Sequence, residues 1–308
     1  MGAFEQKNYK HTVMKVLLVS VAYVLVFQVV TLIAFIIAGV YDHDLMHGER
    51  IEQIGYPYFP GVVCGLFIVF IATSPKLRRT FFKIGPAKMT WRMFGSLVCL
   101  IFFSQFLFTL YANGMEWLLN LFGYSAMDQL KVASGGSQTW SMFLYSGLLA
   151  PVVEELMFRG FVLRSILPYG TNAAILFSSF LFGLYHLNLM QTPFAFLMGI
   201  VLGFVAVEYG LKWSMLLHAF NNTVLGDGLS KLIDLLPTNS SEVVTDVLFL
   251  VGAIIAIIVL VQKRQLIKDW CQAHRPRRGE FKLAFLNLPN ILVTIVAIAL
   301  MLIQISPK

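Results

Sequence analysis

Charged residues are scarce in this chain. They make up 13% of its 308 residues, whereas 58% of the residues are apolar. Ordinary soluble domains contain about 25% charged residues. A soluble protein of this length has too little interior to bury so much apolar surface, which excludes the soluble globular classes. We therefore expect an all-α integral membrane protein, because a helix pairs its own backbone groups within lipid.

Cysteine is also rare. The three cysteines, Cys64, Cys99 and Cys271, form neither a CxxC pair nor an even framework, which excludes a disulfide scaffold and argues against a thiolate zinc site. The net charge of +7 does not indicate nucleic acid, since the basic residues lie between apolar runs. A cleaved signal peptide is excluded too, because the first apolar run exceeds a signal core of about 7–15 residues.

The chain contains several long apolar runs with few or no charged residues. Residues 247–261 and 291–305 are almost wholly apolar, and residues 13–40 contain one charged residue, Lys15. A bilayer span needs about 20 such residues. The pattern predicts a polytopic helical bundle forming one integral membrane domain over residues 1–308. Eight or nine spans are expected, because the seventh candidate is short and polar. The candidates are 13–40, 58–74, 93–112, 141–167, 172–189, 193–208, 212–226, 245–262 and 288–305.

Basic residues are divided unequally between the loops. If the amino terminus is cytoplasmic, 19 Lys and Arg residues fall inside and 4 fall outside. The positive-inside rule therefore predicts a cytoplasmic amino terminus. The outside loops 41–57 and 227–246 are acidic instead, the first with Asp42 and Asp44, the second with Asp227 and Asp234. No organelle-targeting or retention signal is present, so we expect a multi-pass protein of a prokaryotic plasma membrane.

Three ionisable residues stand close together in the fourth span. A charge within hydrocarbon costs a few kcal/mol, so Glu154, Glu155 and Arg159 are each expected to have a structural or functional role that offsets this cost. Glu155 and Arg159 are four residues apart on one helix face and can pair. Glu154 points about 100° away from that face. One arginine requires one carboxylate, which leaves Glu154 as the kind of buried carboxylate that serves as a general base.

Two further spans contribute polar groups that could act together with the Glu154 carboxylate. His186 lies in the fifth span, and His218 and Asn222 are four residues apart on one face of the seventh. A carboxylate and an imidazole can polarise a water molecule, while a second imidazole and an amide can stabilise the resulting oxyanion. A lone histidine in a span is more often a structural hydrogen-bonding residue. The second glutamate and two histidines on separate spans nevertheless favour a catalytic site.

Three motifs carry a resemblance to a known family. Residues 154–160, Glu-Glu-Leu-Met-Phe-Arg-Gly, resemble the EExxFR(G) motif of the CAAX protease/bacteriocin-processing (CPBP, Abi) family of intramembrane endopeptidases. Residues 182–186 and 218–222 are similar to its FxxxH and HxxxN elements, in the same order. The resemblance covers about residues 140–226. It implies an endopeptidase whose substrate is a membrane-associated peptide or a prenylated protein.

The resemblance also implies a role for each motif residue. Glu154 with His186 would activate the hydrolytic water, and His218 with Asn222 would hold the oxyanion. The Glu155–Arg159 pair would brace the helix. Members of the family are often described as metalloenzymes, and zinc would then be held by Glu154, His186 and His218. We favour a metal-free glutamate mechanism without a cofactor, because each histidine lies on its own span and Asn222 is a poor zinc ligand.

Two non-enzymatic readings compete with this one. A membrane immunity or scaffold protein that sequesters a peptide or partner is the main alternative, although such relatives are expected to lose motif residues. A transporter would also place carboxylates in spans, but it predicts pseudo-symmetry between halves, which the sequence lacks. The partners expected are a peptide or lipidated protein and the lipid bilayer, with no nucleic acid. The oligomeric state is left open.

Overall fold

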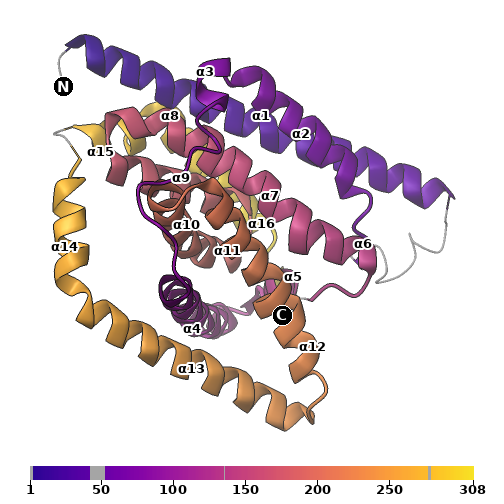
Figure 1. The fold of residues 1–308 in the computed structure, drawn as a ribbon. Coiled ribbons are helices and arrows are strands. Elements are labelled where there is room, and N and C mark those ends of the chain that lie inside the picture. The colour runs from indigo at the N-terminus through magenta and orange to yellow at the C-terminus, as the bar shows by residue number, and fades with distance from the viewer. Residues whose placement is uncertain (1–2, 42–52, 135, 277–278) are drawn as a thin grey trace.

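The computed structural model describes residues 3–41, 53–134, 136–276 and 279–308, and it is almost entirely helical (Figure 1). Among these residues, five helices are long and apolar enough to cross a membrane, and three shorter apolar helices accompany them. The long ones are Phe4–Tyr41, Trp91–Leu121, Trp140–Tyr169, Gln191–Glu208 and Val243–Gln262, and the shorter ones are Tyr58–Ala72, Thr171–Tyr185 and Leu288–Ile303. The all-α membrane bundle is confirmed, whereas the count of eight or nine spans stays a prediction.

Two outer pairs of helices flank a central group. On one side α1 (Ala3–Tyr41) packs along α2 (Tyr58–Ala72), which is followed by the short α3 (Pro75–Arg78). On the other side α4 (Trp91–Leu121) packs against α13 (Thr238–Gln262). Figure 1 shows the central helices between these two pairs.

The central group contains the motif residues. Its first segment runs unbroken over residues 140–169 and alternates between α-helix and the wider π-helix. In order it comprises α6 (Trp140–Met142), π-helical η3 (Phe143–Leu149), α7 (Ala150–Glu155), π-helical η4 (Leu156–Leu163), α8 (Arg164–Ile166) and the 3₁₀ turn η5 (Leu167–Tyr169). The remaining elements are α9 (Thr171–Tyr185), α10 (Gln191–Glu208), α11 (Leu211–Phe220), π-helical η6 (Asn221–Gly228) and α12 (Leu229–Ile233).

Glycine lets the central helices approach closely. A Cβ atom at Gly199 of α10 would lie 2.8 Å from the Cβ of Ser179 on α9, so a larger residue would force the two helices apart. Small residues at such crossings are typical of membrane helix packing. Gly210, between α10 and α11, has a φ of +97°, a conformation that glycine adopts without strain. This sharp turn returns α11 along α10.

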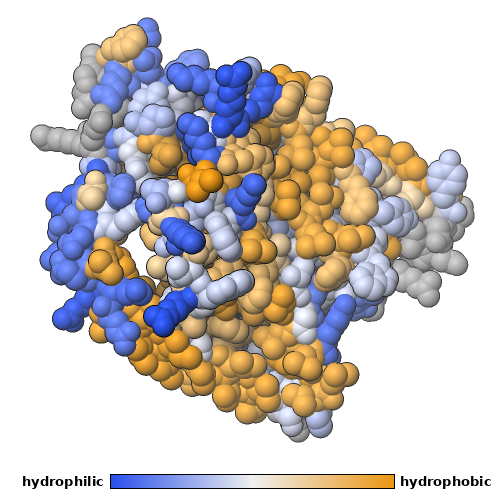
Figure 2. All heavy atoms as spheres, viewed as in Figure 1, coloured by the Kyte–Doolittle hydropathy of each residue, from blue (hydrophilic) through white to orange (hydrophobic). Residues whose placement is uncertain are grey.

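The carboxyl-terminal part of the chain wraps around the bundle. Beyond α13, helix α14 (Arg264–Ala273) leads to α15 (Glu280–Phe285) and α16 (Leu288–Ile303), while α5 (Met127–Ser134) follows α4. The two-residue strands β1 (Tyr124–Ser125) and β2 (Ser306–Pro307) pair in antiparallel fashion. In Figure 2, hydrophilic residues gather over α14 and near the amino terminus, and hydrophobic residues cover most of the rest of this face, as expected for a surface in lipid.

The sequence and the structure differ in one place, and one expected loop is not described. The expected loop 227–246 is wrong in part, because the helix continues through η6 and α12 to Ile233 and α13 begins at Thr238. Hydropathy did not reveal this extension, since polar groups such as Asp227 are buried there by contacts with a distant segment. The acidic residues Asp42 and Asp44 of the expected first outside loop lie outside the described residues.

Candidate active site

The six motif residues come from three helical segments that pack on one another. Glu154 and Glu155 end α7, and Arg159 follows in η4. His186 is the residue directly after α9. His218 is in α11 and Asn222 in η6, on one continuous helix. Because α11 packs against α7 and α9 packs against η4, these helices bring the motifs together in the central group.

The Glu155–Arg159 pair is completely buried, with both side chains at 0% exposure. Arg159 Nη1 donates to Glu155 Oε1 at 2.8 Å, and Nη2 donates to the Gly199 carbonyl at 3.2 Å. The guanidinium also lies over the ring of Phe182, 4.3 Å from its centroid. A charge this deep is tolerated only when paired, so the pair and its neighbours form one unit.

Glu155 has two further partners that the sequence did not reveal. Ser214 Oγ donates to Glu155 Oε2 at 2.5 Å, and His218 Nδ1 lies 3.0 Å from Glu155 Oε1. A carboxylate only accepts, so Nδ1 of His218 is the donor. Ser214 lies four residues before His218 on the same helix face, and this spacing is the signal that could have identified it. Glu155 therefore orients the His218 ring as well as Arg159.

Glu154 differs from its neighbour. Its side chain is 13% exposed. Among the described residues, its ion-pair contact is with His218 Nε2, 3.7 Å from Glu154 Oε2, which is longer than a direct hydrogen bond. His218 therefore bridges the two glutamates, with one ring nitrogen bonded to Glu155 and the other facing Glu154.

His186 is oriented by the backbone of its own helix. Its Nδ1 lies 2.8 Å from the Phe182 carbonyl oxygen, which only accepts, so Nδ1 carries the proton and Nε2 presents its lone pair. The rings of His186 and His218 both pack edge-on against Phe182, at centroid distances of 4.9 Å and 5.7 Å. The phenylalanine of the FxxxH element thus contacts both imidazoles and the Arg159 guanidinium.

The Asn222 amide is held at both ends. Its Nδ2 donates to the Ser146 carbonyl of η3 at 2.8 Å, and its Oδ1 accepts from Asn221 Nδ2 at 2.9 Å. An amide nitrogen has two hydrogens, so one N–H of Asn222 remains for another acceptor. Asn222 and His218 lie on one helix, as the HxxxN spacing requires.

Glu154, His186 and His218 are the residues that would hold zinc. Within the described part of the chain, no group of three or more His, Cys, Asp or Glu side chains is arranged to hold a metal ion. Nδ1 of each histidine bonds within the protein, in His186 to a carbonyl and in His218 to Glu155, which leaves Nε2 of each ring open. The metal-free mechanism stays a prediction.

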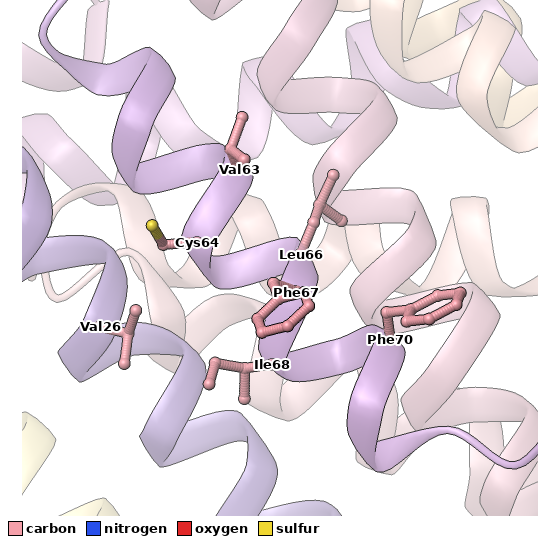
Figure 3. A pocket seen from close by; sticks show the side chains of 7 residues that line it. All are labelled: Val26, Val63, Cys64, Leu66, Phe67, Ile68 and Phe70. Atoms are coloured by element: carbon pink, nitrogen blue, oxygen red, sulfur yellow. The ribbon is translucent and has the colours of Figure 1, made fainter.

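Two hollows lie on the surface of the bundle. The first, shown in Figure 3, lies on α2 and α1; its lining includes Val26, Cys64 and Phe70, and it contains none of the motif residues. The second is an apolar groove between α1, α9 and α16, lined among others by Val24, Leu184 and Val296. Phe158 and Tyr185 also line this groove. Both rings reach the motif residues, since Phe158 packs on Phe182 and Tyr185 packs on His186.

Comparison with known proteins supports the family resemblance. Residues 136–224 match the family model described as "Type II CAAX prenyl endopeptidase Rce1-like". This segment contains all six motif residues, and the resemblance to CAAX proteases that the sequence suggested is confirmed. Comparisons with curated proteins and with solved structures gave no match. The family match covers less than a third of the chain and excludes α1, α2, α4, α13 and α16.

Proposed function

We propose that this multi-pass membrane protein is an intramembrane endopeptidase that uses Glu154 as its general base. The observation that carries the proposal is the contrast within α7, where a fully paired Glu155 lies beside a Glu154 whose ion-pair contact is a single histidine nitrogen. A buried carboxylate that is not consumed by structural contacts is available to accept a proton. The peptidase family matched by residues 136–224 supports the same reaction class.

In the proposed reaction, Glu154 and His186 act on the attacking water. The water oxygen forms a bond to the scissile carbonyl carbon while its proton passes to Glu154, and the carbonyl becomes an oxyanion. The Glu154 proton is then delivered to the leaving nitrogen as the C–N bond breaks, which yields a carboxylic acid and an amine. The lone pair of His186 Nε2 is suited to accepting a hydrogen bond from the water.

His218 and Asn222 are proposed to stabilise the oxyanion. His218 donates through Nδ1 to Glu155 and its Nε2 faces Glu154, so Nε2 can donate to the oxyanion when the ring carries a second proton. Asn222 contributes the N–H that is not bonded to Ser146. Donors held in position before the reaction stabilise developing charge without reorganising, which is the basis of oxyanion-hole catalysis.

The substrate is proposed to be a membrane-associated peptide or a prenylated protein tail. The apolar groove between α1, α9 and α16 supports a lipidated substrate, because Phe158 and Tyr185 connect its walls to the motif residues. A hydrocarbon chain bound there would pack against apolar side chains in place of lipid. Such an anchor would hold the attached peptide beside Glu154.

The membrane arrangement is proposed along with the activity. We propose a single domain over residues 1–308 with eight or nine spans and a cytoplasmic amino terminus in a prokaryotic plasma membrane, on the strength of the basic-residue bias. An impermeant thiol reagent applied from outside, in a background without the three native cysteines, should label Asp234→Cys and spare Lys83→Cys. The reverse labelling would invert the orientation.

A cleavage assay tests the activity. Purified protein in lipid vesicles is given a quenched fluorescent peptide with a prenylated cysteine followed by three residues, alongside an unprenylated membrane-anchored peptide. Wild-type protein should cleave, Glu154→Gln should not, and Asp128→Asn, which changes an exposed acid, should match wild type. If wild-type protein binds both peptides but cleaves neither, the sequestering role replaces the enzyme. Loss of activity to a chelator and its recovery with zinc would overturn the metal-free mechanism.

A further inference from the structure

Asp227 is a buried carboxylate outside the three motifs. It lies in η6, five residues after Asn222, and it is 6% exposed. Its Oδ1 accepts from the Ser137 backbone N–H at 2.5 Å, and its Oδ2 lies 3.0 Å from the Ser137 hydroxyl. Asp227 therefore ties η6 to the chain that enters α6, 90 residues earlier in the sequence.

From Ser137 the contacts continue to the carbonyl that holds Asn222. Ser137 Oγ lies 2.9 Å from Ser146 Oγ. Because Ser146 Oγ gives its one hydrogen to the Met142 carbonyl at 2.8 Å, Ser137 is the donor between the two hydroxyls, and its backbone N–H is the group that binds Asp227. The carbonyl of the same Ser146 accepts from Asn222 Nδ2 at 2.8 Å. Asp227 and Asn222, on one helix, are thus joined twice to the η3 segment, and the two connections meet at Ser146.

The segments η3 and η6 pack closely on one another between these two connections. A Cβ atom at Gly147 would lie 2.8 Å from Thr223 Cγ2 and 3.8 Å from Asp227 Oδ2, so glycine permits the close approach. Both segments are π-helical where they meet. π-Helical turns are uncommon and occur often at functional sites. The Ser146 hydroxyl contacts Ser137 and the Ser146 carbonyl binds Asn222, so this one residue links the two.

We propose that Asp227 is a positioning residue for Asn222 and acts through Ser137 and Ser146. It holds the Ser146 carbonyl where one Asn222 N–H is bound and the other is aimed at the oxyanion. The catalytic part of this inference rests on the proposed function, whereas the orientation of the amide does not. When an aligned donor is displaced by about 1 Å, the rate can fall about 100-fold.

Kinetics and amide spectroscopy together test the link. Asp227→Asn keeps the size and one acceptor, and Ser137→Ala removes the hydroxyl but keeps the N–H. Each should lower kcat by about 10- to 100-fold on the prenylated peptide with KM unchanged. Asp234→Asn, an exposed acid directly after α12, is the matched control and should leave kcat unchanged. In an Asn222→Ala background, Asp227→Asn should cause little further loss, because both changes act on one donor.

The second readout does not depend on activity. In protein labelled with ¹⁵N-asparagine, the Asn222 side-chain signals, assigned by their loss in Asn222→Ala, should shift and exchange faster with solvent in Asp227→Asn and in Ser137→Ala. Unchanged Asn222 signals, or kinetic losses that multiply in the double variant, would overturn the link. Altered signals in a protein that never cleaves peptide would support the positional link and reject the proposed peptidase.

Discussion

Glu154 and Glu155 are consecutive residues of α7, yet their exposure and their contacts differ. Glu155 is 0% exposed and contacts Arg159, His218 and Ser214, whereas Glu154 is 13% exposed and faces one nitrogen of His218 at 3.7 Å. Two identical side chains therefore have different surroundings. Glu155 is held by three partners, and Glu154 faces His218 across a longer gap.

The difference arises from the direction in which each residue points. Successive residues of a helix are rotated by about 100°, so adjacent glutamates face different neighbours. Glu155 faces Arg159, four residues on, and the polar side chains of α11. The predictions below test this division of roles, beginning with the largest expected effect.

Replacing the available carboxylate should have the largest effect. Glu154→Gln removes the proposed general base while keeping the shape of the side chain, and general-base catalysis contributes up to about 10⁴-fold in rate. The cleavage rate should fall by that factor, with the free energy of unfolding nearly unchanged. Single-turnover kinetics and denaturant titration in mixed micelles measure the two quantities. An equal loss of stability in Glu154→Gln and Glu155→Gln would remove the distinction between the residues.

Breaking the buried pair should mainly affect stability. Arg159→Ala leaves Glu155 charged and short of its strongest partner, and breaking a buried ion pair costs about 3–5 kcal/mol. Denaturant titration should show this loss, and Glu155→Gln should also be destabilised. Arg79→Ala, which removes an exposed arginine, is the control and should unfold like wild type. A stable Arg159→Ala protein would show that the pair does not brace the helix.

Removing the proposed oxyanion donor should reduce the rate without stopping the reaction. Loss of one such donor costs about 100- to 1,000-fold in kcat, so Asn222→Ala should be slow but measurable. Asn222→Asp should be at least as slow, because it removes the N–H and adds a negative charge beside the oxyanion. Both variants are measured on the prenylated peptide at saturating concentration. Wild-type rates in Asn222→Asp would show that this side chain donates nothing to the reaction.

The smallest effect is expected at Ser214, whose hydroxyl lies against the paired Glu155 and the Leu202 carbonyl. Ser214→Ala removes a hydrogen bond to a carboxylate, worth about 1.5–3 kcal/mol of stability. The rate should fall modestly, because His218 keeps its own bond to Glu155. Ser214→Thr retains the hydroxyl and should recover part of the stability. A loss of activity as large as that of Glu154→Gln would place Ser214 in the reaction itself.

The features predicted correctly from the sequence are those that depend on residues near one another in the chain. The spacing of four between Glu155 and Arg159 brings the two side chains together on any helix, and the structure has them 2.8 Å apart. The same rule put His218 and Asn222 on one face. Apolar runs marked the central helices, with residues 141–167, 172–189 and 193–208 expected as spans and helices found at 140–169, 171–185 and 191–208.

The sequence by itself determined the membrane class, the helices of the central group and the polar residues that lipid would not tolerate unpaired. These three conclusions follow from composition or from the spacing of residues along one helix. Only the tertiary structure decided how those residues are joined. It placed His218 between two glutamates, Ser214 on Glu155, and Asp227 on Ser137. These contacts join residues 59 to 90 positions apart, and they exist only because packing brings distant helices within hydrogen-bonding distance.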